Sequence, residues 1–434
     1  MSPPVIGVLG IVVLFLLFVM RVPVAFSMLI VGTVGYSVIV SPTAGLALFG
    51  LDAFSHASMY TITVIPMFIL AGGIAFVSGL GTRLFNAAYA IAGRLPGSLC
   101  IAATVGCAGF GAICGSSSAT AAAMGKVAMP AMRRFNYNDA LSSGSIAAAG
   151  TLAVMIPPST VFIVYAVLTE QSVGKLFIAG ILPGILLVIL FSITVLIQCL
   201  RNPSLAPRGH VLTKKEKIQS VSGVFETFVL FVLVIGGLSL GWFSPTQAGG
   251  ILVIGVSIIS VIRRQINFKG FFLALKDSAR LSCMNIFIIV SALIFGRFMA
   301  ISKIPFVLAE LFAAFSESKL LVIIIIMIVY MIGGCFMDGL ALVVLTMPII
   351  FPTILALNID PIWFGVLICV VGELGMITPP VGINVYVLKG VVEDVPLGTI
   401  FRGVTPFIFA TIVCMIILIV FPQISTFLPS LISY

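Results

Sequence analysis

Hydroxyl side chains that could hold a cation or an anion stand in the middle of an apolar stretch, residues 111–130 (GAICGSSSATAAAMGKVAMP). After Gly115 come four of them: Ser116, Ser117, Ser118 and Thr120. Hydroxyls and free carbonyls are the oxygen ligands that hard cations prefer. At membrane depth a helix can break only where it is buried in protein or lines a polar cavity. The stretch therefore predicts a helical hairpin, residues 98–132, with its Gly/Ser tip at a binding site.

A second stretch has the same layout. Residues 333–348 read GGCFMDGLALVVLTMP, with small residues, one polar residue, Asp338, and a closing Met-Pro pair like Met129-Pro130. Each stretch is followed by a glycine and then a Pro-Pro doublet. Two broken elements at corresponding places in the halves of a membrane chain point to the binding site of a transporter. We therefore expect a second hairpin at residues 319–352.

The composition sets the class of protein. The 434 residues are 61% hydrophobic and 8% charged, with a mean hydropathy of +1.31. So few charges cannot cover a soluble globule of this length, and the chain is expected to be a polytopic membrane protein. Its start has no basic region before the apolar run, so we expect a retained first span and not a signal peptide. Two histidines and scattered cysteines without a CxxC pair argue against a transition-metal site.

A membrane-spanning helix needs about 20 apolar residues. By this criterion we expect spans at residues 5–20, 22–40, 61–78, 140–168, 175–200, 222–240, 248–262, 282–299, 355–388 and 403–421. The Pro-Pro doublets should break the segments 140–168 and 355–388. Residues 268–280 carry apolar side chains at helical spacing with basic residues opposite, which predicts a separate interfacial or loop helix.

The basic residues predict the orientation. With the N-terminus outside, most of the 22 lysines and arginines fall on one side, which the positive-inside rule makes cytoplasmic. Both termini are then periplasmic, and the two hairpins enter from opposite sides. The expected fold is an all-α inverted-topology repeat of residues 1–217 and 218–434, joined by a polar linker at 201–217. Positive-inside loops account for the net charge of +9, so no nucleic-acid partner is expected.

These motifs resemble those of one known family. Gly-Ser-Ser-Ser-Ala-Thr at 115–120, Ile-Pro-Pro-Ser at 156–159, the Asp338 segment and Thr-Pro-Pro-Val-Gly-Ile-Asn at 378–384 are similar to the large membrane subunit of tripartite ATP-independent periplasmic (TRAP) transporters. The similarity covers nearly the whole length, with the motifs in the right order in both halves. It implies a sodium-driven importer of organic acids in the bacterial inner membrane. It also implies a scaffold and a transport domain that moves as an elevator.

The resemblance also implies partners. A soluble periplasmic binding protein would deliver a small anionic substrate such as a dicarboxylate or a sialic acid, and a small four-helix membrane subunit would brace the scaffold in the lipid bilayer. Because this sequence opens directly on the large subunit's first span, the small subunit is expected to be a separate chain. Sodium ions would be the coupling ions, and no cofactor is expected.

Two sodium sites are predicted on these segments. The first uses Ser116, Ser117, Ser118 and Thr120 with carbonyls between Gly150 and Pro157. The second uses Gly333, Asp338, Gly375, Thr378 and Pro379, because prolines leave carbonyls of the preceding turn without a donor. The candidate substrate contacts are Ser117, Ser159, Asp338 and Asn384, and helix N-termini nearby would favour a carboxylate.

Other interpretations of the same residues stand beside these. The serines could serve only close helix packing. Asp338 could bind an ion, a proton or the substrate, or cap a helix, and Glu373 could be a packing hydrogen bond or a proton-coupled group. A stand-alone carrier of carboxylates would use the same architecture without a binding protein. An intramembrane protease would need a second aspartate at membrane depth or a Ser–His pair. The sequence offers neither, so an enzyme is not expected.

Overall fold

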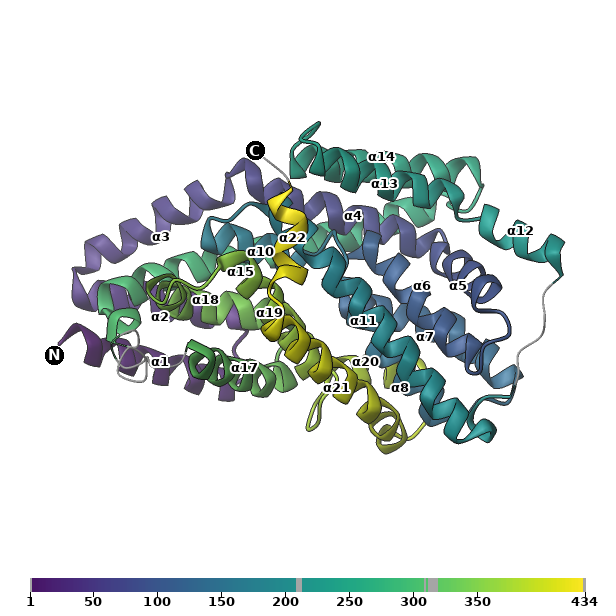
Figure 1. The fold of residues 1–434 in the computed structure, drawn as a ribbon. Helices are drawn as coiled ribbons and strands as arrows, with labels where there is room; N and C mark the ends of the chain where they lie inside the picture. Colours follow the sequence, from purple (N-terminus) through teal and green to yellow (C-terminus); the bar gives the residue numbers. More distant parts are fainter. Residues whose placement is uncertain (1, 208–212, 308–309, 311–318, 432–434) are drawn as a thin grey trace.

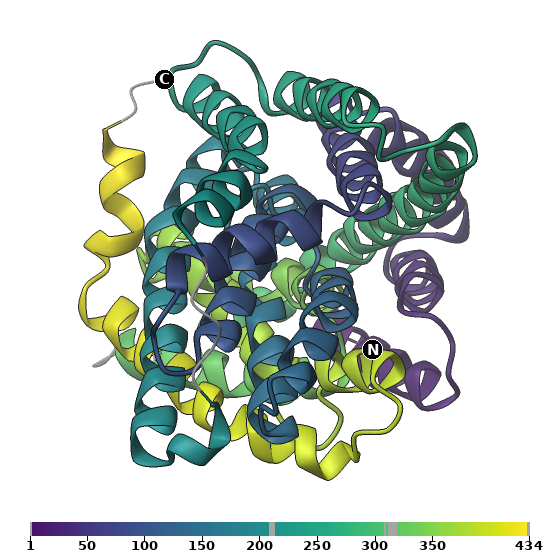
Figure 2. The same ribbon diagram turned by 90° about the vertical axis from the view of Figure 1, so that its right-hand side faces the viewer.

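The computed structural model describes residues 2–207, 213–307, 310 and 319–431, and its regular elements are helices (Figures 1 and 2). The first half contains α1 (Pro3–Val19), α2 (Val24–Ile39), α3 (Pro42–Ala57), η1 (Tyr60–Thr63), α4 (Val64–Val77), α5 (Leu80–Ala92), α6 (Ser98–Cys114), α7 (Ser117–Arg134), α8 (Asp139–Gly150), α9 (Leu152–Met155), α10 (Thr160–Thr169), α11 (Val173–Arg201) and η2 (Pro203–Leu205). The second contains α12 (Lys214–Ser222), α13 (Phe225–Ser239), α14 (Pro245–Ile262), α15 (Phe268–Ser302), α17 (Lys319–Phe336), α18 (Gly339–Ala356), α19 (Pro361–Gly375), α20 (Ile383–Val391), α21 (Leu397–Val420) and α22 (Gln423–Ser430).

The helices are long and apolar enough for a polytopic membrane protein. Within the described residues, 7 helices could each cross a bilayer, or up to 9 when each bent pair is counted as one span. Large apolar side chains cover their outer faces, as expected where lipid is the solvent. The all-helical, multi-span class predicted from the composition is confirmed.

Both predicted hairpins form. In the first, α6 ends at Gly115, whose φ of 61° is in the left-handed region that glycine adopts readily, and Ser116 caps α7. In the second, α17 ends at Phe336 and Asp338 caps α18. At each turn a short polar side chain therefore accepts a hydrogen bond from a backbone amide at the start of the next helix.

Both predicted breaks follow their hairpins. The first half has α8 and α9 bent by 40° from α10 across residues 156–159. The second half has α19 and α20 separated by residues 376–382, where Gly382 with a φ of 62° opens α20. The order of hairpin and broken helix thus recurs in the two halves.

Residues 268–280 do not form a separate helix, so that expectation is wrong. They are the first turns of α15, a continuous helix of 35 residues. No proline and only two glycines, Gly270 and Gly296, interrupt its sequence, and its charged residues lie on the exposed face while Ala274 and Ser278 are buried. At 1.5 Å per residue this helix is roughly 52 Å long. It therefore exceeds the bilayer core of about 30 Å.

Three helices and part of the linker were not expected. The predicted spans pass over α3 and α5, whose polar and small residues dilute the apolar signal, and they end before the short helix α22. The linker predicted at 201–217 contains η2 and the first turn of α12, and residues 208–212 lie outside the described residues.

Two sets of helix–helix contacts join the chain over long sequence distances. In one, α15 packs against α2 and α4, and it also contacts α18. In the other, α8 of the first half crosses α21 of the second. A Cβ atom added to Gly403 would lie 1.8 Å from the carbonyl oxygen of Ala140, and one added to Gly144 would lie 2.1 Å from the carbonyl carbon of Gly403. The backbones therefore touch directly, as small residues allow between membrane helices.

This crossing gives a stability prediction. Gly403→Ala should lower the free energy of unfolding by about 1–3 kcal/mol, because the added methyl group forces α8 and α21 apart. Gly398, also in α21, is the matched control, since no heavy atom lies within 4 Å of a Cβ built there. Thermal unfolding in detergent should show a lower Tm for Gly403→Ala and an unchanged or higher Tm for Gly398→Ala. Equal melting of the two variants would contradict the contact.

Candidate functional site

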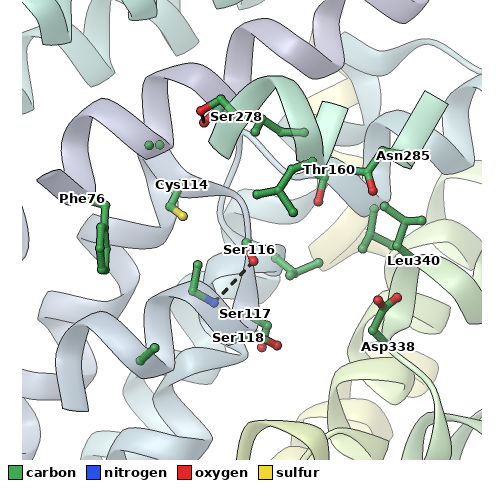
Figure 3. Close-up of a pocket in the computed structure, with 18 of the residues that line it drawn as sticks. Phe76, Cys114, Ser116, Ser117, Ser118, Thr160, Ser278, Asn285, Asp338 and Leu340 are labelled. Atoms are coloured by element: carbon green, nitrogen blue, oxygen red, sulfur yellow. Dashed lines mark hydrogen bonds between the residues drawn. The ribbon is translucent and has the colours of Figure 1, made fainter. Parts of the chain in front are cut away.

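The two hairpin tips and the two helix breaks meet at one cavity of about 440 Å³ (Figure 3). Its walls come from α4, the α6–α7 tip, the break between α9 and α10, α15, the α17–α18 tip and α19. Its polar lining residues are Ser116, Ser117, Ser118, Thr160, Asp277, Ser278, Asn285, Asp338 and Glu373. Segments separated by more than half of the chain therefore share one chamber of the size that small-molecule sites have.

The first tip is fastened to the first break. The carbonyl oxygen of Gly115 accepts a hydrogen bond of 2.9 Å from the Thr160 hydroxyl. A Cβ atom on Gly115 would lie 2.8 Å from the carbonyl oxygen of Pro158, so the two backbones approach closely. Ser116 accepts from the amide of Ala119 at 3.4 Å, which caps α7. Carbonyls and hydroxyls of the tip and the break thus gather within one small region.

The same tip is also tied to the second half of the chain. Asn384, at the start of α20, is buried, and its Nδ2 donates to Ser117 Oγ at 2.6 Å. Ser118 Oγ donates to Asn384 Oδ1 at 3.3 Å. One amide side chain therefore holds two of the three serines, and it joins the first hairpin to the second break.

The second tip presents a carboxylate to the cavity. Asp338 Oδ1 accepts from the amide of Ala341 at 2.7 Å and so caps α18. The side chain remains exposed and lines the cavity, on the side across from Ser117 and Ser118 (Figure 3). Asp338 therefore serves as a helix cap and still has carboxylate oxygen available to a ligand.

A second carboxyl lies deeper. Glu373 of α19 is 2% exposed, lines the cavity, and has its Oε1 3.4 Å from the position that a Cβ on Gly339 would take. Among the described atoms, its Oε2 has no hydrogen-bond partner. A buried oxygen without a donor is costly. Glu373 is thus set against the second hairpin with one oxygen free for a proton or a cation.

The third wall comes from α15. Asp277, Ser278 and Asn285 line the cavity from this helix, and Ser278 Oγ also donates to the carbonyl oxygen of Ile69 in α4 at 3.4 Å. The lining residues in the described part of the chain include three carboxyl groups but neither lysine nor arginine. The chamber is therefore acidic, and a bound anion would need cations beside it.

The remaining predicted site residues lie behind the lining. Thr120 is fully buried next to Cys114, and Ser159 is fully buried and accepts from the amide of Phe162. Gly150 faces the carbonyl oxygen of Ser117, 3.1 Å from where its Cβ would be, and Pro157 lies in the buried break.

Four predicted site residues of the second half also fail to line the cavity. Gly333 packs on Leu342, and a Cβ on Gly375 would lie 2.5 Å from the Cα of Gly334. Thr378 donates its hydroxyl to Leu374, and Pro379 is exposed. These four residues do not line the cavity, whereas Ser116, Ser117, Ser118 and Asp338 do.

The sequence interpretation missed Thr160 and the α15 residues. Ser159 and Thr160 both follow the Pro-Pro doublet, but Ser159 turns inward as the cap of α10, which leaves Thr160 facing the tip. The pattern of a serine before a helix start could have identified that cap. Asn285, in contrast, lies in an ordinary apolar helix and only the tertiary packing reveals it.

The Thr160 contact gives a second prediction. Thr160→Val keeps the shape but removes the hydrogen bond to Gly115, a loss of about 1 kcal/mol. If the first tip holds a sodium ion, as the sequence predicts, and Thr160 positions that tip, the sodium concentration for half-maximal binding should rise about fivefold, as that free energy implies. Thr160→Ser retains the hydroxyl and should behave like the parent chain. A Thr160→Val protein with unchanged sodium dependence would show that the bond does not position the tip.

Comparisons with known proteins identify the family. The family model described as "Tripartite ATP-independent periplasmic transporter, DctM component" matches residues 11–424. The C4-dicarboxylate TRAP transporter large permease protein DctM of Pseudomonas aeruginosa is 35% identical and covers 88% of each chain. The sialic acid TRAP transporter large permease protein SiaM of Vibrio cholerae is 28% identical, over 94% of this chain and 95% of that one.

A solved structure supports the fold. The crystal structure of the Alcanivorax borkumensis YdaH transporter superimposes with a TM-score of 0.54 at 14% identity, covering 88% of this chain and 87% of the other. The relatives by sequence are transport permeases, so the expectation that the chain is not an enzyme is confirmed. The matched length and the sequence identity show that the chain belongs to the DctM family, the large permease components of tripartite ATP-independent periplasmic transporters.

Proposed function

We propose that the chain is the large permease of a sodium-coupled importer for a small organic acid, such as a dicarboxylate, a sialic acid or a similar carboxylate. A periplasmic binding protein delivers the substrate, and a separate small membrane subunit braces the scaffold. Sodium ions are the coupling ions, and no cofactor takes part. The observation that carries the proposal is the meeting of both hairpin tips at one cavity lined by serine hydroxyls and carboxyl groups.

The electrostatics of the cavity favour coupling to cations. Asp277, Asp338 and Glu373 contribute carboxyl groups, and no described lining residue is basic. Like charges at close range disfavour the binding of a carboxylate substrate. Sodium at the hydroxyls and carbonyls of the first tip and at Asp338 would offset that repulsion. Substrate binding then depends on sodium, which is the thermodynamic requirement for symport.

The hydrogen bonds across the site suggest which parts move together. Thr160 joins the first hairpin to the first break, and Asn384 joins the same hairpin to the second. We propose that the two hairpins and the two broken helices together form the transport domain. The hairpin and broken helix of residues 1–217 would correspond to those of residues 218–434, with inverted topology. The long helix α15, which packs on α2 and α4, belongs to the scaffold along which that domain slides.

The distribution of charge supports an inner-membrane location with both termini periplasmic. Basic residues crowd the ends of α7 and α14 and the segment that includes α12, which the positive-inside rule assigns to the cytoplasm. In this orientation the first hairpin enters from the cytoplasmic side and the second from the periplasmic side.

Uptake into proteoliposomes tests the function. The chain would be reconstituted with the small subunit, and radiolabelled succinate and sialic acid would be offered with or without a binding protein for each, under an inward sodium gradient or a matched potassium gradient. The proposal expects uptake only when the binding protein and the sodium gradient are both present. An unrelated binding protein is the control.

Other results would change the assignment. Uptake without any binding protein would make the chain a stand-alone carrier of carboxylates. Uptake that needs the binding protein but is equal in sodium and in potassium would remove sodium as the coupling ion. A label that reports the N-terminus on the cytoplasmic side would reverse the orientation while leaving the uptake result intact.

A further inference from the structure

A basic and apolar patch lies where α12 packs against the end of α5. We define the patch by Arg94, Lys214, Lys215 and Lys217 with the exposed apolar residues Ile91, Leu95, Ile218 and Val221. The apolar side chains are 74%, 48%, 70% and 42% exposed, respectively. In Figure 1, α12 stands at the edge of the molecule beside α5. The proposed transport function assigns no task to this surface.

The two helices form one surface because Lys217 reaches across. Its Nζ lies 3.6 Å from the position that a Cβ on Gly93 would take, directly before Arg94. The only acidic residue of α12 is Glu216, and its carboxylate accepts from the Thr213 amide at 2.7 Å in a capping box. The nearby Glu226 is paired with Arg263. Positive charge therefore dominates the patch.

The spacing along α12 mixes the two kinds of side chain. Lys214 precedes Ile218 by one helical turn, and Lys217 precedes Val221 by one turn, so each ammonium lies next to an apolar side chain on the same face. A lysine can extend its charge away from an apolar surface while its methylene groups stay on it. Such a helix fits the boundary between acyl chains and headgroups.

The direction of α12 agrees with this placement. It is bent by 41° from α13, which is apolar and continues into the body of the molecule. A helix that turns away from a span at its end can lie along the membrane surface. The capping box that starts α12 stabilises it as a helix outside the span.

We propose that this patch binds the headgroups of anionic phospholipids in the cytoplasmic leaflet and anchors the junction between the two halves of the chain. The inference rests on the orientation in the proposed function and not on transport itself. Attraction to an anionic leaflet is worth about fivefold in binding for each basic residue near the surface. The apolar residues supply the insertion, and the four basic residues supply the preference for negative lipids.

Fluorescence quenching tests the proposal on the full chain. Cys283 is the exposed cysteine and the other seven are buried, so Cys283→Ser with Gln219→Cys gives one reactive site on α12. A dye at this site would be quenched by nitroxide-labelled lipid in vesicles of phosphatidylcholine, with or without phosphatidylglycerol. We expect stronger quenching with phosphatidylglycerol, and weaker quenching as salt is added.

Two variants provide the controls. Replacing Arg94, Lys214, Lys215 and Lys217 together by Gln should abolish the difference between the two vesicle types. Exchanging the same residues for the other basic residue, Lys→Arg and Arg94→Lys, should preserve it. Equal quenching in both lipids for the parent chain, or an unchanged difference in the Gln variant, would overturn the proposal. The proposal would also be overturned if a membrane-impermeant reagent reacted with the site at residue 219 from the periplasmic side. None of these outcomes depends on uptake.

Discussion

Asp338→Asn should reduce the proposed sodium-driven uptake about a hundredfold while leaving the protein folded. A charged ligand contributes about 1.5–3 kcal/mol to such a site, which corresponds to this loss. Asn is as good a helix cap as Asp, so its side-chain oxygen can still accept from the amide of Ala341. The variant therefore removes the charge that faces the cavity and keeps the cap. Sodium-dependent uptake in proteoliposomes and thermal unfolding are the two measurements.

Asp338→Ala is the comparison that separates the two roles. It removes both the charge and the cap, so it should lose uptake and also about 1 kcal/mol of stability. If Asp338 were only a cap, Asn would transport normally and Ala would not. If the charge matters, both variants lose uptake and only Ala melts earlier. Asp360, which caps α19 by accepting from the amide of Trp363, supplies the control Asp360→Asn, for which we expect normal uptake.

The sequence predicts the hairpins well because their signals are local. A glycine, three serines and an aspartate inside apolar runs conflict with a plain spanning helix, and the Pro-Pro doublets remove backbone donors. These signals need no knowledge of tertiary contacts. They place Ser116, Ser117, Ser118 and Asp338 at the cavity, where the structure has them.

The errors come from residues whose role depends on distant packing. The sequence predicts Ser117 and Asn384 as candidate substrate contacts, but it does not show that the two side chains share a hydrogen bond across 267 positions of the chain. Thr378 has the right residue type for a ligand, but its hydroxyl donates to the carbonyl oxygen of Leu374 in the preceding helix α19. Residues 268–280 look like an interfacial helix because their periodicity does not show that the helix continues. Such facts follow from the packing of whole helices.

The first hairpin tip gives the other large expected effect. Gly115 has a φ of 61°, and a Cβ atom there would lie 2.8 Å from the carbonyl oxygen of Pro158. Gly115→Ala therefore adds backbone strain of about 1 kcal/mol in the left-handed region. It also adds a clash that pushes the tip away from the break. Because the tip carries the three serines, we expect uptake to fall about a hundredfold, as a displacement of about 1 Å can produce.

Gly79 offers a matched control, because it has nearly the same backbone conformation without the contact. Its φ is 68°, and no heavy atom lies within 4 Å of a Cβ built on it. Gly79→Ala thus carries the strain alone, and its uptake should stay within about twofold of the parent, since a surface change of this kind costs little beyond the strain. Similar losses in both variants would mean that strain in the fold, and not the position of the tip, limits transport. A selective loss in Gly115→Ala would tie uptake to the close approach of Gly115 and Pro158.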